Sequence, residues 1–242
     1  MFFPERIKSI KKEDKVLEVG PGNTPFYRSN VLLEKRFEDE NVAIEQSGRT
    51  KKVNLKKEII YYDGNDFPFE DNSFDYIICA HVLEHIPKSE LEHFLFELTR
   101  VSKKGYIEVP LYNFEFIANL KYHENLVYID KVNRIHFLSK DDVDIDIELM
   151  QSFRSSLTNI GFNSEIIPLN LEIFGNGFEF NHEFKFTIHQ SFDSFYDIVK
   201  NEEGMKKIRW TKDYKYYIER ILSLFNPILA KQRIYNRFKV VL

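Results

Sequence analysis

Short apolar runs that end at turn-forming residues recur in the first part of the chain. Three of them lie at Lys15–Val19 (KVLEV, before a Gly-Pro-Gly turn), Asn41–Gln46 (NVAIEQ) and Glu58–Tyr62 (EIIYY, before an Asp-Gly pair). A short apolar run bounded by turn residues is typical of a buried strand. The pattern therefore predicts three strands, with a weakly amphipathic helix over Tyr27–Glu40 between the first two.

The alternation continues with a longer helix between two further strands. Phe74–Ala80 (FDYIICA) predicts a fourth buried strand and Tyr106–Val109 (YIEV) a fifth. Between them, Ser89 is a candidate N-cap and Gly105 a candidate C-terminal stop of a helix whose apolar residues share one face. These residues are Leu91, Phe94, Leu95, Leu98 and Val101. Strands that alternate with helices predict a Rossmann-like, mostly parallel sheet with helices on both faces.

The pattern is less regular beyond the fifth strand. Residues 111–138 are aromatic and polar without a clear period, which indicates an insertion over the sheet edge and a candidate lid. We predict a helix from Ser139 to about Ile160 and a sixth strand at Ser164–Leu169. The apolar alternation over Phe178–His189 predicts a last strand or a hairpin.

These elements make up an α/β fold with seven strands, the last of them antiparallel, in one domain over residues 1–200. A helical, aromatic tail follows over residues 201–242. The tail holds ten basic and four acidic residues, a net charge of +6, so residues 1–200 carry −10 of the total charge of −4. Such a tail could meet an anionic glycan, a nucleic acid or a lipid surface, or be a solvated helix face that packs on the domain.

Acidic residues and glycines stand where the predicted strands end. Glu18 precedes the turn formed by Gly20, Pro21 and Gly22, Glu45 ends the second predicted strand, and Asp63 follows the third. In a parallel sheet the ligand lies beyond the carboxyl ends of the strands, and glycine lets it approach the backbone closely. Glu45 is placed to accept hydrogen bonds from a ribose diol, and Asp63 from an adenine amino group. The arrangement predicts a nucleoside site.

Phosphate-binding signatures are missing from this loop. The third glycine of a dinucleotide fingerprint is replaced by Pro25, and the chain has no G-x-x-x-x-G-K-[ST] segment for a triphosphate. The loop therefore suits a nucleoside cofactor without phosphate better than NAD or ATP.

Three motifs in fixed order carry a resemblance to a known family. They are VLEVGPGNTPF (Val16–Phe26), DGNDFPFEDNSFDYIICAHVLEHI (Asp63–Ile86) and LTRVSKKGYIEVP (Leu98–Pro110). Together they resemble the class I S-adenosylmethionine-dependent methyltransferases of the methyltransferase-11 type. The resemblance covers residues 16–110 and implies that the chain is an enzyme whose cofactor is S-adenosyl-L-methionine.

The resemblance also implies roles for individual residues. The loop of Glu18, Gly20, Pro21 and Gly22 would hold the methionine and ribose parts of the cofactor, and Glu45 the ribose hydroxyls. Asp63 and the Gly64 backbone would flank adenine, and Cys79 to His81 would line the floor near the sulfonium. The chain departs from the family pattern at Asn23-Thr24-Pro25 and at Gln46-Ser47-Gly48-Arg49.

Methyl transfer is an in-line displacement, so the main task of the protein is to position the acceptor, with or without a base that removes the acceptor's proton. His81 is the candidate base, or else a residue that packs against or caps the next helix. Tyr112 and His123, with His136, are candidates for the acceptor site, or else surface or lid residues. His81 and His85 have the i, i+4 spacing of a metal pair, but no third ligand is evident, so we predict no metal.

The remaining features narrow the setting. Cys79 is the only cysteine, which excludes an intramolecular disulfide and a cysteine-based zinc site. The charged stretch Met1–Lys15 has no apolar core of a secretory signal, and no segment is long enough to span a membrane, so we expect a cytoplasmic protein. The leading hypothesis is methyl transfer to a small molecule or glycan. The alternatives are an RNA methyltransferase that uses the basic tail and a binding subunit that keeps the fold without catalysis.

Overall fold

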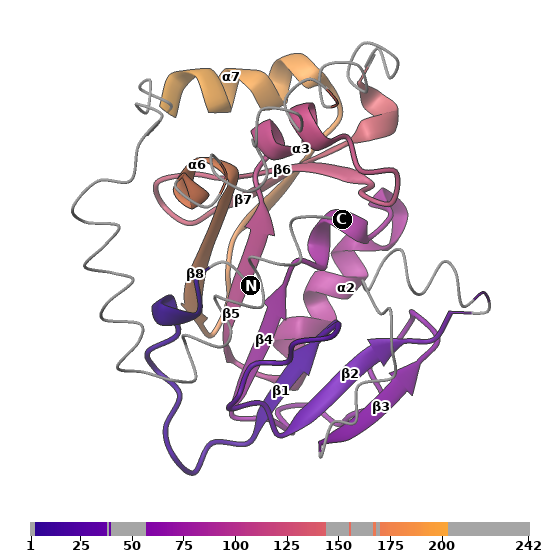
Figure 1. Ribbon diagram of the computed structural model, residues 1–242, viewed down its shortest axis with the longest axis vertical. Coiled ribbons are helices and arrows are strands. Elements are labelled where there is room, and N and C mark those ends of the chain that lie inside the picture. The colour runs from indigo at the N-terminus through magenta and orange to yellow at the C-terminus, as the bar shows by residue number, and fades with distance from the viewer. Residues whose placement is uncertain are drawn as a thin grey trace.

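The computed structural model describes residues 3–37, 39, 57–143, 155, 167 and 170–202. Their main feature is a six-stranded sheet with the order β3-β2-β1-β4-β5-β8 (Figure 1). All neighbouring strands are parallel except β5 and β8, which are antiparallel. The strands are β1 (Val16–Val19), β2 (Val31–Lys35), β3 (Glu58–Tyr62), β4 (Tyr76–Ala80), β5 (Lys104–Pro110) and β8 (Gly175–Asn181). The predicted α/β sheet with an antiparallel edge strand is confirmed, but the sheet has six described strands and not seven.

The second strand corrects the sequence prediction. β2 lies within the stretch predicted as a helix, and its residues Val31–Leu33 are all buried between β1 and β3. A central parallel strand is covered on both faces, so it appears in the sequence as a continuous apolar run and not as an alternating one. The run is only three residues long and is followed by charged residues, which is why it was read as part of a helix. The predicted strand Asn41–Gln46, with Glu45, lies outside the described residues.

One face of the main sheet is covered by α2 (Lys88–Val101). The predicted apolar stripe is confirmed, since all five of its residues are buried against the β-strands. The helix begins two residues earlier than predicted, with Pro87 and not Ser89 at the N-cap, and without a side-chain cap. The turn that precedes α2, residues 83–86, carries part of the candidate site.

The other face is covered by the N-terminal segment, which contains the 3-10 helix η1 (Pro4–Arg6). Ile7 and Ile10 pack against Tyr76, Ile78 and other residues that point away from α2. Side chains on a strand alternate between the two faces, and Ile77 and Cys79 accordingly pack on the α2 side. In the described part of the chain, helices on both faces are therefore not found, because an extended segment takes the place of one layer.

A second sheet of three strands lies between the main sheet and α7 (Phe192–Glu202) (Figure 1). Its order is β6-β7-β9, with β6 (Asn125–Ile129) antiparallel to β7 (Ile135–Ser139) and β9 (Phe186–His189) parallel to β7. Val127 packs in the main core, while its neighbours Leu126 and Tyr128 pack toward α7. The segment predicted as an insertion thus contributes two strands and α3 (Tyr112–Ala118), and both faces of β6 are buried.

The remaining predictions have mixed outcomes. The last predicted strand or hairpin is two strands, β8 and β9, which belong to different sheets. Ser139 begins the 3-10 helix η3 (Lys140–Asp142), and its hydroxyl accepts the Asp141 N–H, whereas the rest of the predicted helix is outside the described residues apart from residue 155. Of the predicted sixth strand only Ile167 is described, and it is helical. The short helices η2 (Leu83–His85) and α6 (Leu171–Phe174) were not predicted.

Residues 203–242 of the predicted tail are likewise outside the described part. Within that part, no helix has both the length and the apolar character needed to cross a membrane.

Candidate functional site

The loop after β1 turns sharply at two glycines. Gly20 has a φ of 60° and Gly22 a φ of 55°, a conformation that glycine adopts without steric cost. The Gly20 N–H donates to the Leu33 carbonyl at 2.8 Å, which ties the loop to β2. A Cβ atom at Gly20 would lie 2.5 Å from a methyl group of Val82, so the loop passes directly against the chain that follows β4. Both predicted glycine positions are therefore required by the backbone.

Glu18 holds this loop from the inside. Its carboxylate is 4% exposed and accepts the Phe26 N–H at 2.7 Å and the Ser29 hydroxyl at 2.6 Å. Burial raises the pKa of Glu18, and these hydrogen bonds and the charge of Lys57 oppose the increase. Lys57 in turn donates to the Phe26 carbonyl at 2.7 Å. The geometry shows that Glu18 shapes the loop, and the direct cofactor contact that the resemblance implies stays a prediction.

A buried acid at the end of β2 was missed by the sequence prediction. Glu34 is 6% exposed and lies one residue beyond Leu33, the acceptor of the Gly20 N–H. It occupies the second-strand position that the sequence analysis gave to Glu45. The signal was present, because Glu34 follows an apolar run as the acids of the other strands do, but the run itself was assigned to a helix.

The turn after β3 presents a solvated carboxylate. Asp63 is exposed, and one of its oxygens accepts the Asn65 N–H at 3.0 Å; the hydrogen bonds with Asn65 lower the pKa of Asp63. Gly64 has a φ of 107°, and the end of the Lys35 side chain lies 2.8 Å from where its Cβ would be. Because β1, β2 and β3 are adjacent and parallel, Glu18, Glu34 and Asp63 stand at one edge of the sheet.

The end of β4 contributes a core thiol and an exposed backbone turn. Cys79 is 1% exposed, its side chain packs in the core on the α2 side, and burial raises its pKa. Because the side chain lies in the core, only the backbone of Cys79 can line the floor of the predicted cofactor site. His81 follows with a φ of 58°, an uncommon conformation for a residue with a side chain, and its N–H donates to the Glu108 carbonyl at 2.8 Å.

Two carboxylates hold the His81 ring. Its Nε2 atom lies 2.9 Å from Glu108 and its Nδ1 atom 3.6 Å from Glu84. Burial would lower the pKa of His81, but the hydrogen bond with Glu108 and the nearby Glu84 carboxylate raise it above the ordinary value. Glu108 is fully buried and also accepts the Tyr106 hydroxyl and the Phe3 N–H. Burial works against its ionisation, yet its partners, His81 first, bring its pKa down to about 2.

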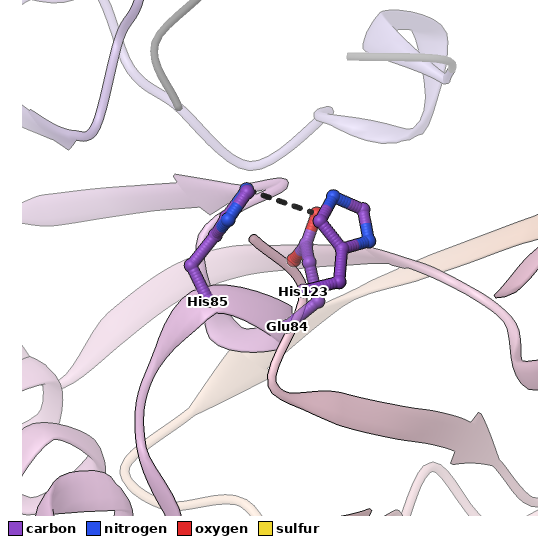
Figure 2. A group of neighbouring side chains, drawn as sticks. All are labelled: Glu84, His85 and His123. Atoms are coloured by element: carbon purple, nitrogen blue, oxygen red, sulfur yellow. Dashed lines mark ion pairs between the residues drawn. The ribbon is translucent and has the colours of Figure 1, made fainter. Parts of the chain in front are cut away.

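Glu84 in η2 lies beside the imidazole rings of His85 and His123 (Figure 2). The ring of His81 is a third neighbour of this carboxylate. It is 1% exposed, and although burial works against ionisation, these rings bring its pKa down to about 2. Burial lowers the pKa of His85 to about 4. The rings of His85 and His123 meet edge to face with centroids 4.5 Å apart. The structure therefore brings the predicted residues His81 and His123 close to the carboxylate of Glu84. The sequence analysis did not single out Glu84, which appeared there only as part of the motif Asp63–Ile86.

The turn that carries Glu84 is joined to the start of β6. The Asn125 side-chain amide donates to the Leu83 carbonyl at 3.3 Å and to the Ile86 carbonyl at 2.7 Å. The Glu124 N–H donates to the Glu84 carbonyl at 2.7 Å. These bonds connect the end of the main sheet to the second sheet.

The other two acceptor-site candidates lie in the second sheet and its covering layer. Tyr112 packs in the aromatic cluster toward α7, with ring centroids about 6 Å from those of Phe116, Tyr128 and Phe195. His136 is 4% exposed and bonds to His189 at 3.0 Å and to Asp130 at 3.3 Å. Neither is among the groups that surround Glu84.

Comparison with known proteins finds similarity to one family over part of the chain. Residues 17–107 match the family described as "Methyltransferase domain". This match agrees with the resemblance to methyltransferases of the methyltransferase-11 type seen in the sequence motifs. The matched stretch extends from β1 to the middle of β5 and leaves the second sheet outside.

Individual relatives are similar over part of their length. The Aspergillus luteorubrus protein named "Probable methyltransferase ltbC" is 32% identical over 110 residues, which are 40% of this chain and 39% of that protein. A Pyrococcus horikoshii OT3 protein of known crystal structure is 25% identical over 51% of this chain and 66% of its own, with a TM-score of 0.37. A SAM-dependent methyltransferase from Methanosarcina mazei is 17% identical over 50% of this chain and 69% of its own, with a TM-score of 0.32.

Proposed function

We propose that this protein transfers the methyl group of S-adenosylmethionine to a small-molecule or glycan acceptor. The observation that carries the proposal is the edge formed by β1, β2 and β3, where a glycine loop and the carboxylates of Glu34 and Asp63 stand on adjacent strands. A nucleoside without phosphates needs acceptors for its hydroxyl and amino groups and close backbone approach to the rest. The residues present fit that requirement.

Each part of the edge has a distinct task in this proposal. The backbone of Gly20, Pro21 and Gly22 would face the methionine part of the cofactor, and Glu18 would keep the loop in shape. Glu34 would accept from the ribose hydroxyls, in place of Glu45. Asp63 and the Gly64 backbone would flank adenine, and the backbone from Cys79 to His81 would lie near the sulfonium.

The chemistry asks little of the protein beyond position and proton removal. The bound cofactor supplies an electrophilic methyl group, and the acceptor atom must lose a proton as its bond to that carbon forms. In its neutral form His81 donates from Nε2 to Glu108, so that Nδ1 is the atom able to take this proton. Glu84, 3.6 Å from Nδ1, would then stabilise the imidazolium.

Charge supports a small or saccharide acceptor over RNA. Residues 1–200 carry a net charge of −10, whereas a nucleic-acid-binding domain presents a basic surface to the phosphates. The +6 of residues 201–242 is the feature that would favour RNA. Binding to RNA that weakens steeply with salt would move the acceptor to that class.

Calorimetric titration with S-adenosylmethionine and S-adenosylhomocysteine tests the cofactor part. We expect Glu34→Gln to weaken binding by about 10-fold or more, since a hydrogen bond to a charged group contributes about 1.5–3 kcal/mol. Glu58→Gln, at the exposed start of β3, is the matched control and should bind as wild type does. Wild-type protein that binds neither compound, or unchanged affinity in both Glu34→Gln and Asp63→Ala, would sink the proposal. Labelled-methyl transfer to fractions of a lysate then identifies the acceptor.

A further inference from the structure

Glu84, His85 and His123 bring three metal-binding atoms together (Figure 2). One carboxylate oxygen and one nitrogen from each ring all lie within 4.8 Å of one another, and His85 Nε2 is 3.9 Å from Glu84 Oε1. The first two residues belong to η2 and the third to the loop before β6, so the fold and not the sequence spacing creates the group.

The hydrogen bonds of both imidazoles leave the same atom for a metal. His85 Nδ1 lies 2.8 Å from the Tyr122 carbonyl, which can only accept, so Nδ1 carries the hydrogen. His123 Nδ1 bonds to the Glu115 carboxylate, which fixes that ring in the same tautomer. A histidine that ligates a metal through Nε2 characteristically donates its Nδ1–H to a carbonyl or carboxylate in this way. The second layer of a metal site is therefore built.

The Glu84 carboxylate points to the same conclusion from its own side. Its side chain is 1% exposed, and neither oxygen accepts a hydrogen bond from any group in the described part of the chain. The closest ring nitrogens, those of His81 and His85, are 3.6 and 3.9 Å away, beyond hydrogen-bond length. A buried carboxylate without hydrogen bonds is unfavourable unless a cation balances it.

We propose that Glu84, His85 and His123 bind one divalent transition-metal ion, with Zn²⁺ the ion that the donor set fits best. Two nitrogens and one carboxylate oxygen are a ligand set of zinc sites that keep a fourth position open. Ligands about 2.0–2.1 Å from a tetrahedral ion stand about 3.4 Å apart. The observed atoms lie within 4.8 Å of one another, so they need to approach by up to about 1.4 Å. The proposal differs from the sequence expectation of no metal, because it pairs His85 with His123 and Glu84 and not with His81.

The position of the site gives the ion a task, and this step alone rests on the proposed function. Glu84 also faces His81, the proposed base, so an ion here adjoins the place of proton removal. A Zn²⁺ ion lowers the pKa of a hydroxyl or water that it binds. The acceptor class would then be one with an oxygen able to ligate the ion.

A second group of similar residues lacks these features and serves as a control. Asp66, His93 and Glu97 also have ligand atoms within 4.8 Å of one another. Asp66 is 81% exposed, however, and both oxygens of Glu97 are already bonded, to Arg100 and to the Phe67 N–H. We assign no ion to this group.

The test measures binding of Zn²⁺ and Co²⁺ to the full chain after removal of metal with EDTA. We expect one equivalent of Zn²⁺ in competition with a chromophoric chelator, and a visible Co²⁺ spectrum of a site with four or five ligands. Glu84→Gln and His123→Gln should each weaken Zn²⁺ binding at least 10-fold, whereas His93→Gln should leave it unchanged. Zn²⁺ should raise the Tm of the wild type and of His93→Gln but not of Glu84→Gln.

Several results would overturn the metal site. They are no stoichiometric binding by the wild type, equal affinity in Glu84→Gln, or loss of binding in His93→Gln alone. If Glu84→Gln fails to fold, the Co²⁺ spectrum and the Tm shift of the wild type still decide the matter. Titration of EDTA-treated protein with S-adenosylhomocysteine separates the two proposals, because cofactor binding does not require the ion.

Discussion

At the scale of single residues, the loop after β1 is determined by contacts that only particular side chains allow. Gly20 is restricted both by its positive φ and by the methyl group of Val82. Glu18 is restricted by the two donors that it satisfies inside the loop. Glu18, which the sequence suggested as a cofactor-binding residue, therefore makes hydrogen bonds within the protein itself.

Replacing Gly20 with alanine should lower the free energy of unfolding by about 1–3 kcal/mol, through left-handed strain and the contact with Val82. Urea denaturation measures the effect. The double variant Gly20→Ala/Val82→Ala separates the two causes, since it relieves the clash and keeps the strain. It should be less destabilised than the sum of the two single variants, and strict additivity would contradict the contact.

Replacing Glu18 with alanine should leave the Phe26 N–H and the Ser29 hydroxyl without their acceptor, at a cost of about 1–3 kcal/mol for each buried group. Affinity for S-adenosylhomocysteine should fall with it, because the loop loses its shape. Ser29→Ala removes one donor together with its need for an acceptor and should be milder in both measurements. A Glu18→Ala protein of wild-type stability would show that the loop is held by other contacts.

At the scale of elements, the sequence predicted those strands and helices whose signal is local. β1, β3, β4, α2 and β5 were expected near their observed bounds because each is an apolar run or stripe closed by turn residues. β2 was missed because its run is short and its register is fixed by neighbours on both sides. The pairing of β7 with β9 joins residues about fifty positions apart, and no local pattern signals it.

In the candidate site, too, residues with a local sequence signal were predicted and contacts between distant residues were not. Gly20, Gly22, Asp63 and His81 were predictable because the ends of parallel strands share an edge. The contact between His85 and His123 could not be predicted, because it arises where the chain after β5 packs against η2 in the folded protein.

The contact between β9 and α7 makes stability depend on pH. His189 bonds to His136 and Ser194, and burial and the nearby His136 lower its pKa below 6.5. Between that lowered pKa and 6.5 the unfolded chain binds more protons, so the free energy of unfolding should rise with pH and level off above 6.5. Urea denaturation between pH 5 and 8 measures this slope. His189→Asn should reduce the slope, and an unchanged slope would assign it to other groups.

At the scale of the whole molecule, the second sheet and the main sheet share one core. Phe137 of β7 is fully buried in the cluster that also contains the residues of α2 and β4. Phe137→Ala should therefore lower the free energy of unfolding of the entire protein by about 3–5 kcal/mol. It should do so in a single transition, seen alike by circular dichroism and tyrosine fluorescence.

Phe96→Ala is the matched control, since that ring is 58% exposed on α2. Its effect should be within about 0.5 kcal/mol. Two separate unfolding transitions in the Phe137 variant would show instead that the sheets are independent units.

The bonds from Asn125 and Glu124 to the turn Leu83–Ile86 have a consequence for protein engineering. If the proposed function holds, an exchange of residues 111–139 for the corresponding stretch of a methyltransferase, intended to alter acceptor choice, would break these bonds unless the new stretch supplied the same amides. Both the turn Leu83–Ile86 and residues 111–139 should therefore be taken from the same parent protein. Recombination libraries that combine them from different parents should contain few active variants.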